Sequence, residues 1–171
     1  MILDQNIDFS KLRTYRLDRV KKELEKQNIE ACILFDPVNV RYALDTTNMS
    51  VYNLHNLTRY CFIPVNGPTI LYEYFGCEYH AKHLNLIDEI RPAITWDYFS
   101  HGDQAEKELK KWVNDVKDLS KYFKSKKVAI DVINGPAVTA LNKEGIEVVD
   151  AKFILEQARV IKSPEELKCI K

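Results

Sequence analysis

The feature that most constrains the fold is an unbroken apolar run, Ala-Cys-Ile-Leu-Phe, at residues 31–35. Its length and composition are typical of a β-strand that is buried on both faces. Asp36 and Pro37 end the run, because proline lacks an amide hydrogen for a strand ladder and suits the first turn of a helix. The sequence therefore predicts a buried strand and then a short helix over residues 38–44, capped by Asp36. The polar loop after this helix is expected at the end of a sheet, where open α/β sheets bind their ligands.

Helical and extended patterns alternate along the rest of the chain. Apolar residues recur every three to four positions over residues 10–27 and 102–123, which predicts two long helices. Shorter helices are expected at 76–84, 136–142 and 150–158, and further strands at 59–65, 69–74, 87–91, 128–131 and 145–149. Asn66-Gly67 favours a hairpin between the first two of these strands. The alternation predicts an α/β fold: a mixed sheet of about five to six strands with helices on both faces.

The order of strands within this sheet can also be anticipated. The apolar strands at 31–35 and 128–131 are expected at its centre, since both are continuous hydrophobic runs. The hairpin strands carry Pro64, Pro68 and Glu73, which are more typical of a sheet edge. We therefore expect the hairpin to be peripheral.

Composition excludes several classes of protein. The 171 residues are 46% hydrophobic, and 25 Lys and Arg balance 25 Asp and Glu, so charge favours neither nucleic acid nor an anionic membrane as a partner. The longest apolar runs are too short to span a bilayer, and the N-terminus lacks a signal-peptide pattern. We therefore expect a cytoplasmic protein. Its four cysteines, which lack Cys-x-x-Cys spacing, are expected to be reduced thiols, mostly buried: Cys32, Cys61, Cys77 and Cys169.

The last segment differs from the rest of the chain. Ser163 can cap a helix, Pro164 fits its first position, and Glu166 stands where a capping box requires an acidic residue. This helix begins strongly, yet the sequence stops about two turns later. We therefore expect residues 1–158 to form one domain and residues 159–171 to begin a second domain of a longer protein.

Two patches of the sequence resemble the creatinase/prolidase family, which includes Xaa-Pro dipeptidases and Xaa-Pro aminopeptidases. Residues 36–43, Asp-Pro-Val-Asn-Val-Arg-Tyr-Ala, resemble the family's strand-to-helix segment with its Asn-x-x-Tyr pattern. Residues 158–167, Ala-Arg-Val-Ile-Lys-Ser-Pro-Glu-Glu-Leu, resemble the Arg-x-x-Lys-Ser-x-x-Glu junction at the start of its catalytic domain. The resemblance implies the family's N-terminal domain fold, with a ribonuclease H-like motif. Residues 45–48 stand where the family often has Thr-Gly, which leaves the subfamily open.

The resemblance also implies how the chain would contribute to function. Family members hold two divalent ions, such as manganese, cobalt or zinc, on two Asp, one His and two Glu of a C-terminal domain that this sequence does not contain. There the two ions activate a water and polarise a carbonyl. The chain itself is therefore expected to catalyse nothing. It would support a homodimer and help bind a proline-containing peptide or other small zwitterionic substrate at a partner subunit's active site.

Two other functions fit the same resemblance. Asn48-Met49 followed by Val51, His55 and Arg59 resembles a branch of the family that cleaves dimethylsulfoniopropionate. Related folds also serve as non-catalytic binding modules, for example in a histone-chaperone subunit. The metal-ligand residues of the following domain would separate an enzyme from a binding module.

The segment at 45–59 holds the candidate substrate-binding residues Asn48, Tyr52, His55 and Arg59. A polar loop on a rigid scaffold is a common place for binding, and Arg59 could grip a substrate carboxylate, although an arginine there is often only an edge charge. His55 and Arg59 are expected to be exposed, so replacing either should change stability by less than about 0.5 kcal/mol.

Independent chemistry elsewhere is sparse. His80 and His83 are three residues apart and could share a metal with Glu78 or Asp88, but a solvated helix face is the more common meaning of this spacing. Asp131 follows a buried strand and could bind a ligand, although capping the next helix is the commoner role.

Overall fold

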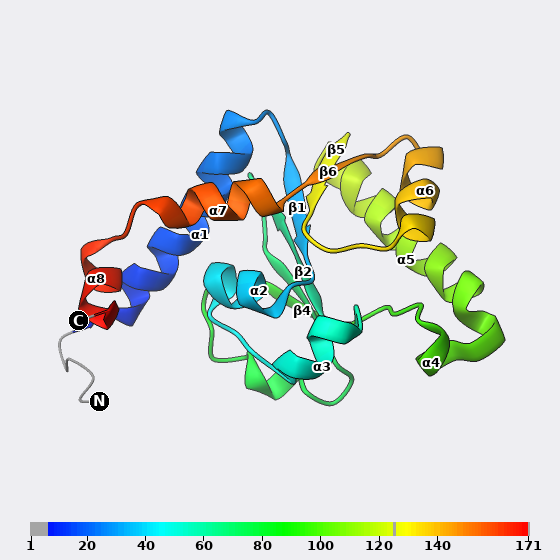
Figure 1. The fold of residues 1–171 in the computed structure, drawn as a ribbon, viewed down its shortest axis with the longest axis horizontal. Helices are drawn as coiled ribbons and strands as arrows, with labels where there is room; N and C mark the ends of the chain where they lie inside the picture. The colour runs from blue at the N-terminus through cyan, green and yellow to red at the C-terminus, as the bar shows by residue number, and fades with distance from the viewer. Residues whose placement is uncertain (1–6, 125, 171) are drawn as a thin grey trace.

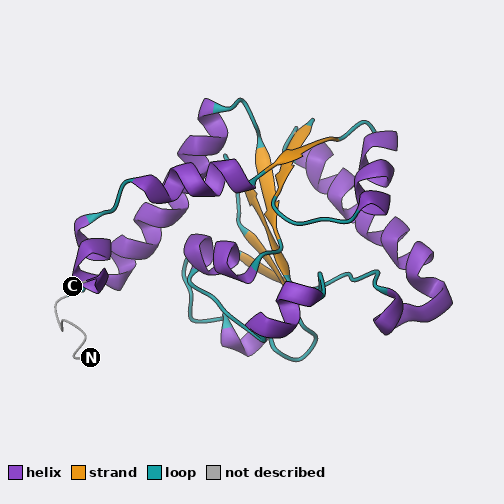
Figure 2. Ribbon diagram, in the orientation of Figure 1, coloured by secondary structure: helices purple, strands orange, loops and turns teal. Residues whose placement is uncertain are grey.

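The computed structural model describes residues 7–124 and 126–170, which form a six-stranded sheet between two layers of helices (Figure 1; Figure 2). The sheet has the order β4-β3-β2-β1-β5-β6. Its strands are β1 (Ala31–Leu34), β2 (Tyr60–Pro64), β3 (Ile70–Glu73), β4 (Glu89–Pro92), β5 (Lys127–Ile130) and β6 (Glu147–Asp150). β2 pairs antiparallel with β1 and β3, and the other pairs are parallel. The expected mixed α/β sheet is therefore confirmed.

Helices cover both faces of the sheet, as Figure 1 shows. One layer consists of α1 (Phe9–Lys26), α2 (Pro37–Leu44) and α7 (Lys152–Val160), and the other of α5 (Ala105–Tyr122) and α6 (Gly135–Lys143). The side chains of β1 alternate between the layers, because successive residues of a strand point to opposite faces. Cys32 and Leu34 pack under the first layer, whereas Ala31, Ile33 and Phe35 pack under the second.

Local signals explain where several elements begin. The Asp36 carboxylate accepts hydrogen bonds from the amides of Val38 and Asn39 at 2.7 and 3.2 Å, so it caps α2 as expected. At α8 (Pro164–Ile170), the Glu166 amide donates to Ser163 Oγ at 3.1 Å, and the Ser163 amide donates to the Glu166 carboxylate at 3.0 Å. The predicted capping box is therefore present. The domain boundary expected at residue 158 stays a prediction.

The expected position of the hairpin was wrong. β2 lies directly beside β1 at the centre of the sheet, β3 is also an interior strand, and β4 and β6 are the edges. Pro64 is tolerated because it is the last residue of β2, where one missing amide breaks little of the ladder. Glu73 is tolerated because it is paired with an arginine, as described below.

Three local expectations were also wrong. Residues 76–84 contain only a 3₁₀ turn, η1 (Glu78–His80), in place of a helix. The long helix expected from residue 102 starts only at Ala105, as α5. Gly102 has φ +50° and interrupts the helical backbone, so α4 (Tyr98–His101) and η2 (Gly102–Gln104) come before it. Residues 45–59, expected to be a loop, contain α3 (Ser50–His55).

Two expectations from composition can be compared with the structure. Cys32 and Cys61 are buried, Cys77 is half-buried and Cys169 is exposed, and all four are free thiols. Within residues 7–124 and 126–170, every helix is too short or too polar to cross a membrane.

Hydrogen exchange tests the strand order. We expect the amides of β1 and β2 to be the most protected, and those of the edge strands β4 and β6 to open with free energies lower by about 2 kcal/mol or more. The reason is that an edge strand loses its ladder without disturbing the rest of the sheet. Exchange measured by NMR at single residues provides the comparison, and protection of Val148 in β6 equal to that of Phe62 in β2 would contradict this arrangement.

Candidate functional site

Two residues with positive φ shape the segment after α2. Asp45 has φ +55° and its carboxylate accepts a 2.7 Å hydrogen bond from Nε of Arg13, which ties the end of α2 to α1. Met49 also has a positive φ, at +41°, and α3 follows it at once. Asn53, buried within α3, donates from Nδ2 to the Asn48 carbonyl at 2.6 Å. The segment is therefore ordered by its own hydrogen bonds.

Arg59 is buried, so its expected exposure was wrong. It is 2% exposed and forms a 2.8 Å ion pair from Nε to Oε2 of Glu73, which is 0% exposed. Its Nη2 also donates to Oγ1 of Thr46 at 2.7 Å. A buried charge requires a partner of opposite sign, and Glu73 on the neighbouring strand supplies it. Arg59 thus stabilises the 45–59 segment from the interior of the domain.

Asn48 belongs to the same buried network. Its Nδ2 donates to Oε1 of Glu73 at 3.1 Å, and the amide of Tyr74 donates to the same oxygen at 2.9 Å. Glu73 therefore joins Asn48 and Arg59, two residues from opposite ends of the 45–59 segment. Sequence reasoning missed this role for Glu73. The signal available in the sequence was a single glutamate in an otherwise apolar strand, together with an arginine just before the neighbouring strand.

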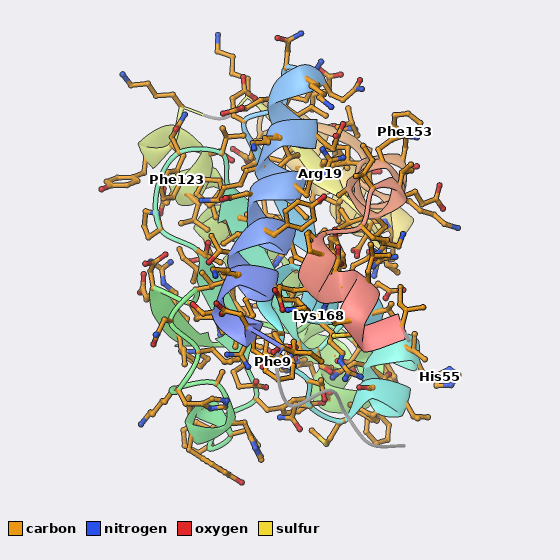
Figure 3. All side chains as sticks on the ribbon, turned by 90° about the vertical axis from the view of Figure 1, so that its left-hand side faces the viewer. Phe9, Arg19, His55, Phe123, Phe153 and Lys168 are labelled. Atoms are coloured by element: carbon orange, nitrogen blue, oxygen red, sulfur yellow. The ribbon has the colours of Figure 1, made fainter. Side chains whose placement is uncertain are left out.

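The other two candidates lie nearer the surface. Tyr52 is half-buried, and its ring centroid is 6.2 Å from that of Tyr74, whose pKa burial raises to about 12. His55 is exposed, as expected, and Figure 3 shows it pointing away from the body of the domain. The structure thus divides the four candidates into two outer residues, Tyr52 and His55, and two inner ones, Asn48 and Arg59.

A groove of about 310 Å³ lies beside α3. Its apolar walls and its polar rim come from three segments: Leu54, His55, Asn56, Leu57, Trp96, Asp97, Val132, Ile133 and Asn134. Residues 132–134 directly follow β5, so the groove lies at the carboxyl end of a parallel strand, where open sheets commonly bind ligands. Its lining suits a small molecule with an apolar body and a few polar groups.

The alternative candidates have structural roles. The His80 ring packs on Tyr79 with centroids 4.1 Å apart, and in the described part of the chain no three His, Cys, Asp or Glu side chains are grouped to hold a metal. Asp131 does not cap α6, since Asn134 does. Instead its carboxylate accepts from the amides of Phe35 and Asp36 at 2.8 and 3.2 Å, and burial raises its pKa.

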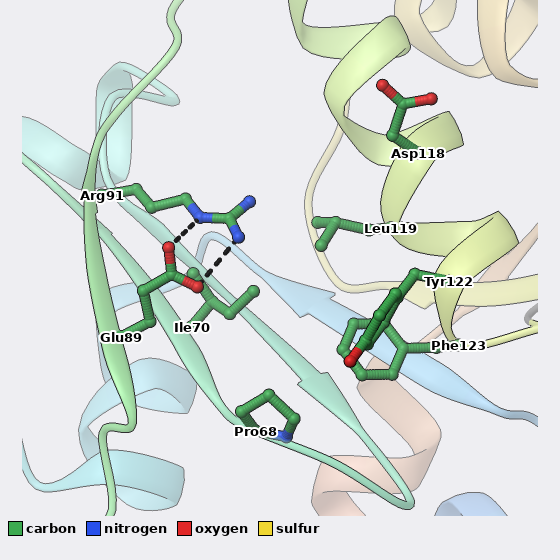
Figure 4. A pocket seen from close by; sticks show the side chains of 8 residues that line it. All are labelled: Pro68, Ile70, Glu89, Arg91, Asp118, Leu119, Tyr122 and Phe123. Carbon is green, nitrogen blue, oxygen red and sulfur yellow. Dashed lines mark hydrogen bonds and ion pairs between the residues drawn. The ribbon is translucent and has the colours of Figure 1, made fainter.

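A second cavity, of about 360 Å³, lies between the β3–β4 edge and α5 (Figure 4). Arg91 points into it, but its guanidinium donates to both oxygens of Glu89 at 2.6 and 2.8 Å and is 3.5 Å from the Asp115 carboxylate. The hydrogen bonds to Glu89 hold the pKa of Arg91 above its usual value. The cation is therefore already neutralised, and the cavity offers no unpaired arginine to an anionic ligand.

Comparison with known families identifies the class of this fold. The creatinase/prolidase N-terminal domain model matches residues 16–161. The chain therefore belongs to the creatinase/prolidase N-terminal domain family.

Two curated relatives are similar over nearly all of this chain. It is 26% identical over 166 residues to the dimethylsulfoniopropionate lyase DddP of Roseobacter denitrificans, covering 96% of the chain and 37% of that protein. It is 27% identical over 162 residues to the DddP of Roseovarius nubinhibens, covering 94% of the chain and 36% of that protein. The chain thus spans little more than a third of the length of these relatives.

Solved structures share the fold at lower identity. An Xaa-Pro aminopeptidase from Streptococcus thermophilus has a TM-score of 0.62 at 16% identity, with 86% of this chain and 98% of that chain covered. The prolidase from Pyrococcus horikoshii OT3 has a TM-score of 0.58 at 15% identity, covering 90% of this chain and 37% of that chain. These likenesses confirm the fold expected from the sequence.

Substitutions separate the inner residues from the outer ones. Arg59→Ala should lower the free energy of unfolding by roughly 3–5 kcal/mol, because it leaves the Glu73 carboxylate buried without its cation. His55→Ala should change it by less than about 0.5 kcal/mol, since its side chain is exposed. Urea unfolding followed by circular dichroism gives both values. The double variant Arg59→Met, Glu73→Met should recover most of the loss, and a small effect of Arg59→Ala alone would contradict the importance of the pair.

Proposed function

We propose that this chain is the substrate-access domain of a creatinase/prolidase-family enzyme that cleaves a small zwitterion, as the dimethylsulfoniopropionate lyases do. The observation that carries the proposal is the likeness of 26% and 27% to two such lyases across almost the whole chain. The peptidase structures are only 14–16% identical in sequence to this chain, so their likeness shows the fold alone. The sequence pattern at Asn48-Met49, Val51, His55 and Arg59 supports the same branch.

The groove beside α3 offers suitable chemistry for such a substrate. Dimethylsulfoniopropionate carries a methylated cationic sulfur and a carboxylate. Trp96 and Ile133 provide apolar wall, Asp97 a carboxylate for the cation, and His55 a donor for the substrate carboxylate. His55 would contact the substrate, while Asn48 and Arg59 hold the segment in place from below. Tyr52 packs on Tyr74 and is not among the residues that line the groove.

Catalysis would belong to the longer protein and not to this domain. The described residues hold no cluster that fits a divalent ion, so no chemical step is assigned to them. The proposal places the ion-binding centre in a following domain, places the longer protein in the cytoplasm as a homodimer, and gives this domain a share of the dimer contacts.

A second candidate is an Xaa-Pro peptidase. It is favoured by the solved neighbours, which include an aminopeptidase P and a prolidase. Its substrate, a proline-containing peptide, is also a small zwitterion, so the same groove would serve.

An assay of the longer protein decides between the candidates. Incubation with dimethylsulfoniopropionate should release dimethyl sulfide, detected by headspace gas chromatography, and incubation with an Xaa-Pro dipeptide should release no proline. His55→Ala should raise KM about tenfold or more with little change in kcat, because one charge-assisted contact of roughly 1.5–3 kcal/mol is lost. Lys110→Ala on the exposed face of α5 serves as the control. Release of proline alone would support the peptidase, and an unchanged KM would remove His55 from the site.

The isolated chain provides a separate test of where the metal resides. Titration with Mn²⁺ in a calorimeter should show no stoichiometric binding, and the chain should hydrolyse no Xaa-Pro dipeptide. Tight binding of one or two ions per chain would overturn this expectation. Loss of that binding in His80→Ala but not in His101→Ala would then locate the site on η1.

A further inference from the structure

A line of polar contacts starts at the end of β5. The Asp131 carboxylate accepts from the amides that end β1, and its Oδ2 also accepts a 2.9 Å hydrogen bond from Nδ2 of Asn39. The other end of the same amide, Oδ1 of Asn39, accepts a 2.5 Å hydrogen bond from Nη2 of Arg159. Asn39 therefore bridges β5 to α7 by using both halves of its side-chain amide.

Tyr42 continues this line one helical turn further along α2. The Arg159 guanidinium lies 5.0 Å from the centroid of its ring, and the Arg16 guanidinium of α1 lies 5.3 Å from it. The Tyr42 hydroxyl donates to the Ala158 carbonyl at 2.9 Å. Burial raises the pKa of Tyr42 to about 12, so the hydroxyl remains a donor at neutral pH. One side chain thus contacts both arginines and the end of α7.

Arg16 extends this series of polar contacts to α8. Its Nε donates to Oε1 of Glu166 at 2.8 Å, and the same glutamate accepts the Ser163 amide in the capping box. Glu166 is 4% exposed and Ser163 is 6% exposed, although they lie near the end of the chain. Figure 3 shows α8, marked by Lys168, lying beside α1, marked by Phe9 and Arg19. α8 is therefore held against α1 by a charged contact.

The residues of this line come from both patches that resemble the family pattern. Asn39 and Tyr42 are the fixed positions of the first patch, and Arg159, Ser163 and Glu166 belong to the second. The two patches, about 120 residues apart, meet in space through the 2.5 Å bond between Asn39 and Arg159. Arg16 and Asp131 lie outside both patches and complete the connection.

We propose that Asp131, Asn39, Arg159, Tyr42, Arg16 and Glu166 form a junction clamp that sets the orientation of α8 relative to the sheet. Asn39, Tyr42 and Arg159 are positioning residues, since they act through α8. The consequence is that whatever follows α8 in a longer protein leaves the domain in one direction relative to the groove beside α3. This inference concerns the chain's own geometry and does not depend on the proposed substrate.

Native cysteines allow a direct measurement. Cys169 on α8 is exposed and Cys77 near η1 is half-buried, so these two thiols are the ones to label with a nitroxide reagent. Cys32 and Cys61 are buried and their thiols have raised pKa values. Pulsed electron paramagnetic resonance between the two labels should give one narrow distance distribution in the unaltered chain. Asn39→Ala and Tyr42→Ala should broaden it. Tyr42→Phe keeps the ring contacts with both arginines, so the distribution should stay narrow.

Matched controls exclude a general loss of structure. Tyr122→Ala and Asn142→Ala remove exposed residues of the same types from α5 and α6 and should leave the distribution narrow. Circular dichroism must show that each variant is folded. Arg159→Gln is a mild change at a half-buried position, and it should also broaden the distribution if Tyr42→Ala does not fold. Narrow distributions in folded Asn39→Ala and Arg159→Gln would overturn the proposal.

A conservative variant adds a readout that loss of packing would not produce. Asn39→Asp places a second carboxylate against Asp131, with Arg159 and the Asp36 carboxylate as its other neighbours. Cys32 and Cys61, whose thiols have raised pKa values, lie near Asp131. At pH 7 the two carboxylates should repel and the distribution should broaden. At about pH 5 a shared proton should make the aspartic acid resemble asparagine and restore the narrow form. Asn39→Ala should stay broad at both pH values, and an Asn39→Asp variant that does not respond to pH would contradict the clamp.

Discussion

The central strand β1 leaves no place for a polar side chain, and the rest of the structure depends on this constraint. Helices cover both of its faces, and β2 and β5 occupy both of its edges. The apolar run at 31–35 must therefore be followed by groups that end the strand and satisfy the amides just after it. Asp131 accepts the amides of Phe35 and Asp36, and Asp36 in turn caps α2. The burial of β1 thus concentrates polar chemistry at its carboxyl end, where both the groove and the junction clamp are found.

The buried pair of Arg59 and Glu73 illustrates how an exposed site can depend on a hidden interaction. Desolvating two charges costs free energy that their attraction offsets only when further hydrogen bonds satisfy both groups. Thr46, Asn48 and the Tyr74 amide provide those bonds. An apolar pair of the same size could stabilise the fold as well, but it would not hold Asn48 and Thr46. The physical contribution of the ion pair is therefore to fix the chain that carries α3, and with it His55.

Local signals in the sequence were sufficient for much of the fold and for only part of the site. The strand at 31–35, the Asp36 cap and the Ser163 capping box depend on neighbours within a few residues, so they can be anticipated from the chain alone. The burial of Arg59 depends on Glu73, fourteen residues away on another strand, and no local pattern reveals that pairing. The hairpin was misplaced for the same reason. A glutamate indicates an edge strand only when no distant partner pairs with it, and a proline only when its missing amide would break the strand ladder. α3 was missed because it has only six residues and its start has no side-chain cap.

The contact between Asn39 and Arg159 explains in physical terms why two short patterns far apart in sequence belong together. An asparagine amide has a donor and an acceptor, so it can bridge a carboxylate and a guanidinium, whereas aspartate or lysine at that position would repel one of the two. The same helix, α2, carries this bridge at its start and delivers the 45–59 segment at its end. A change in the position of α2 would therefore move α8 and the wall of the groove together. In this fold, the helix that positions the 45–59 segment also positions α8, and the two cannot be altered independently.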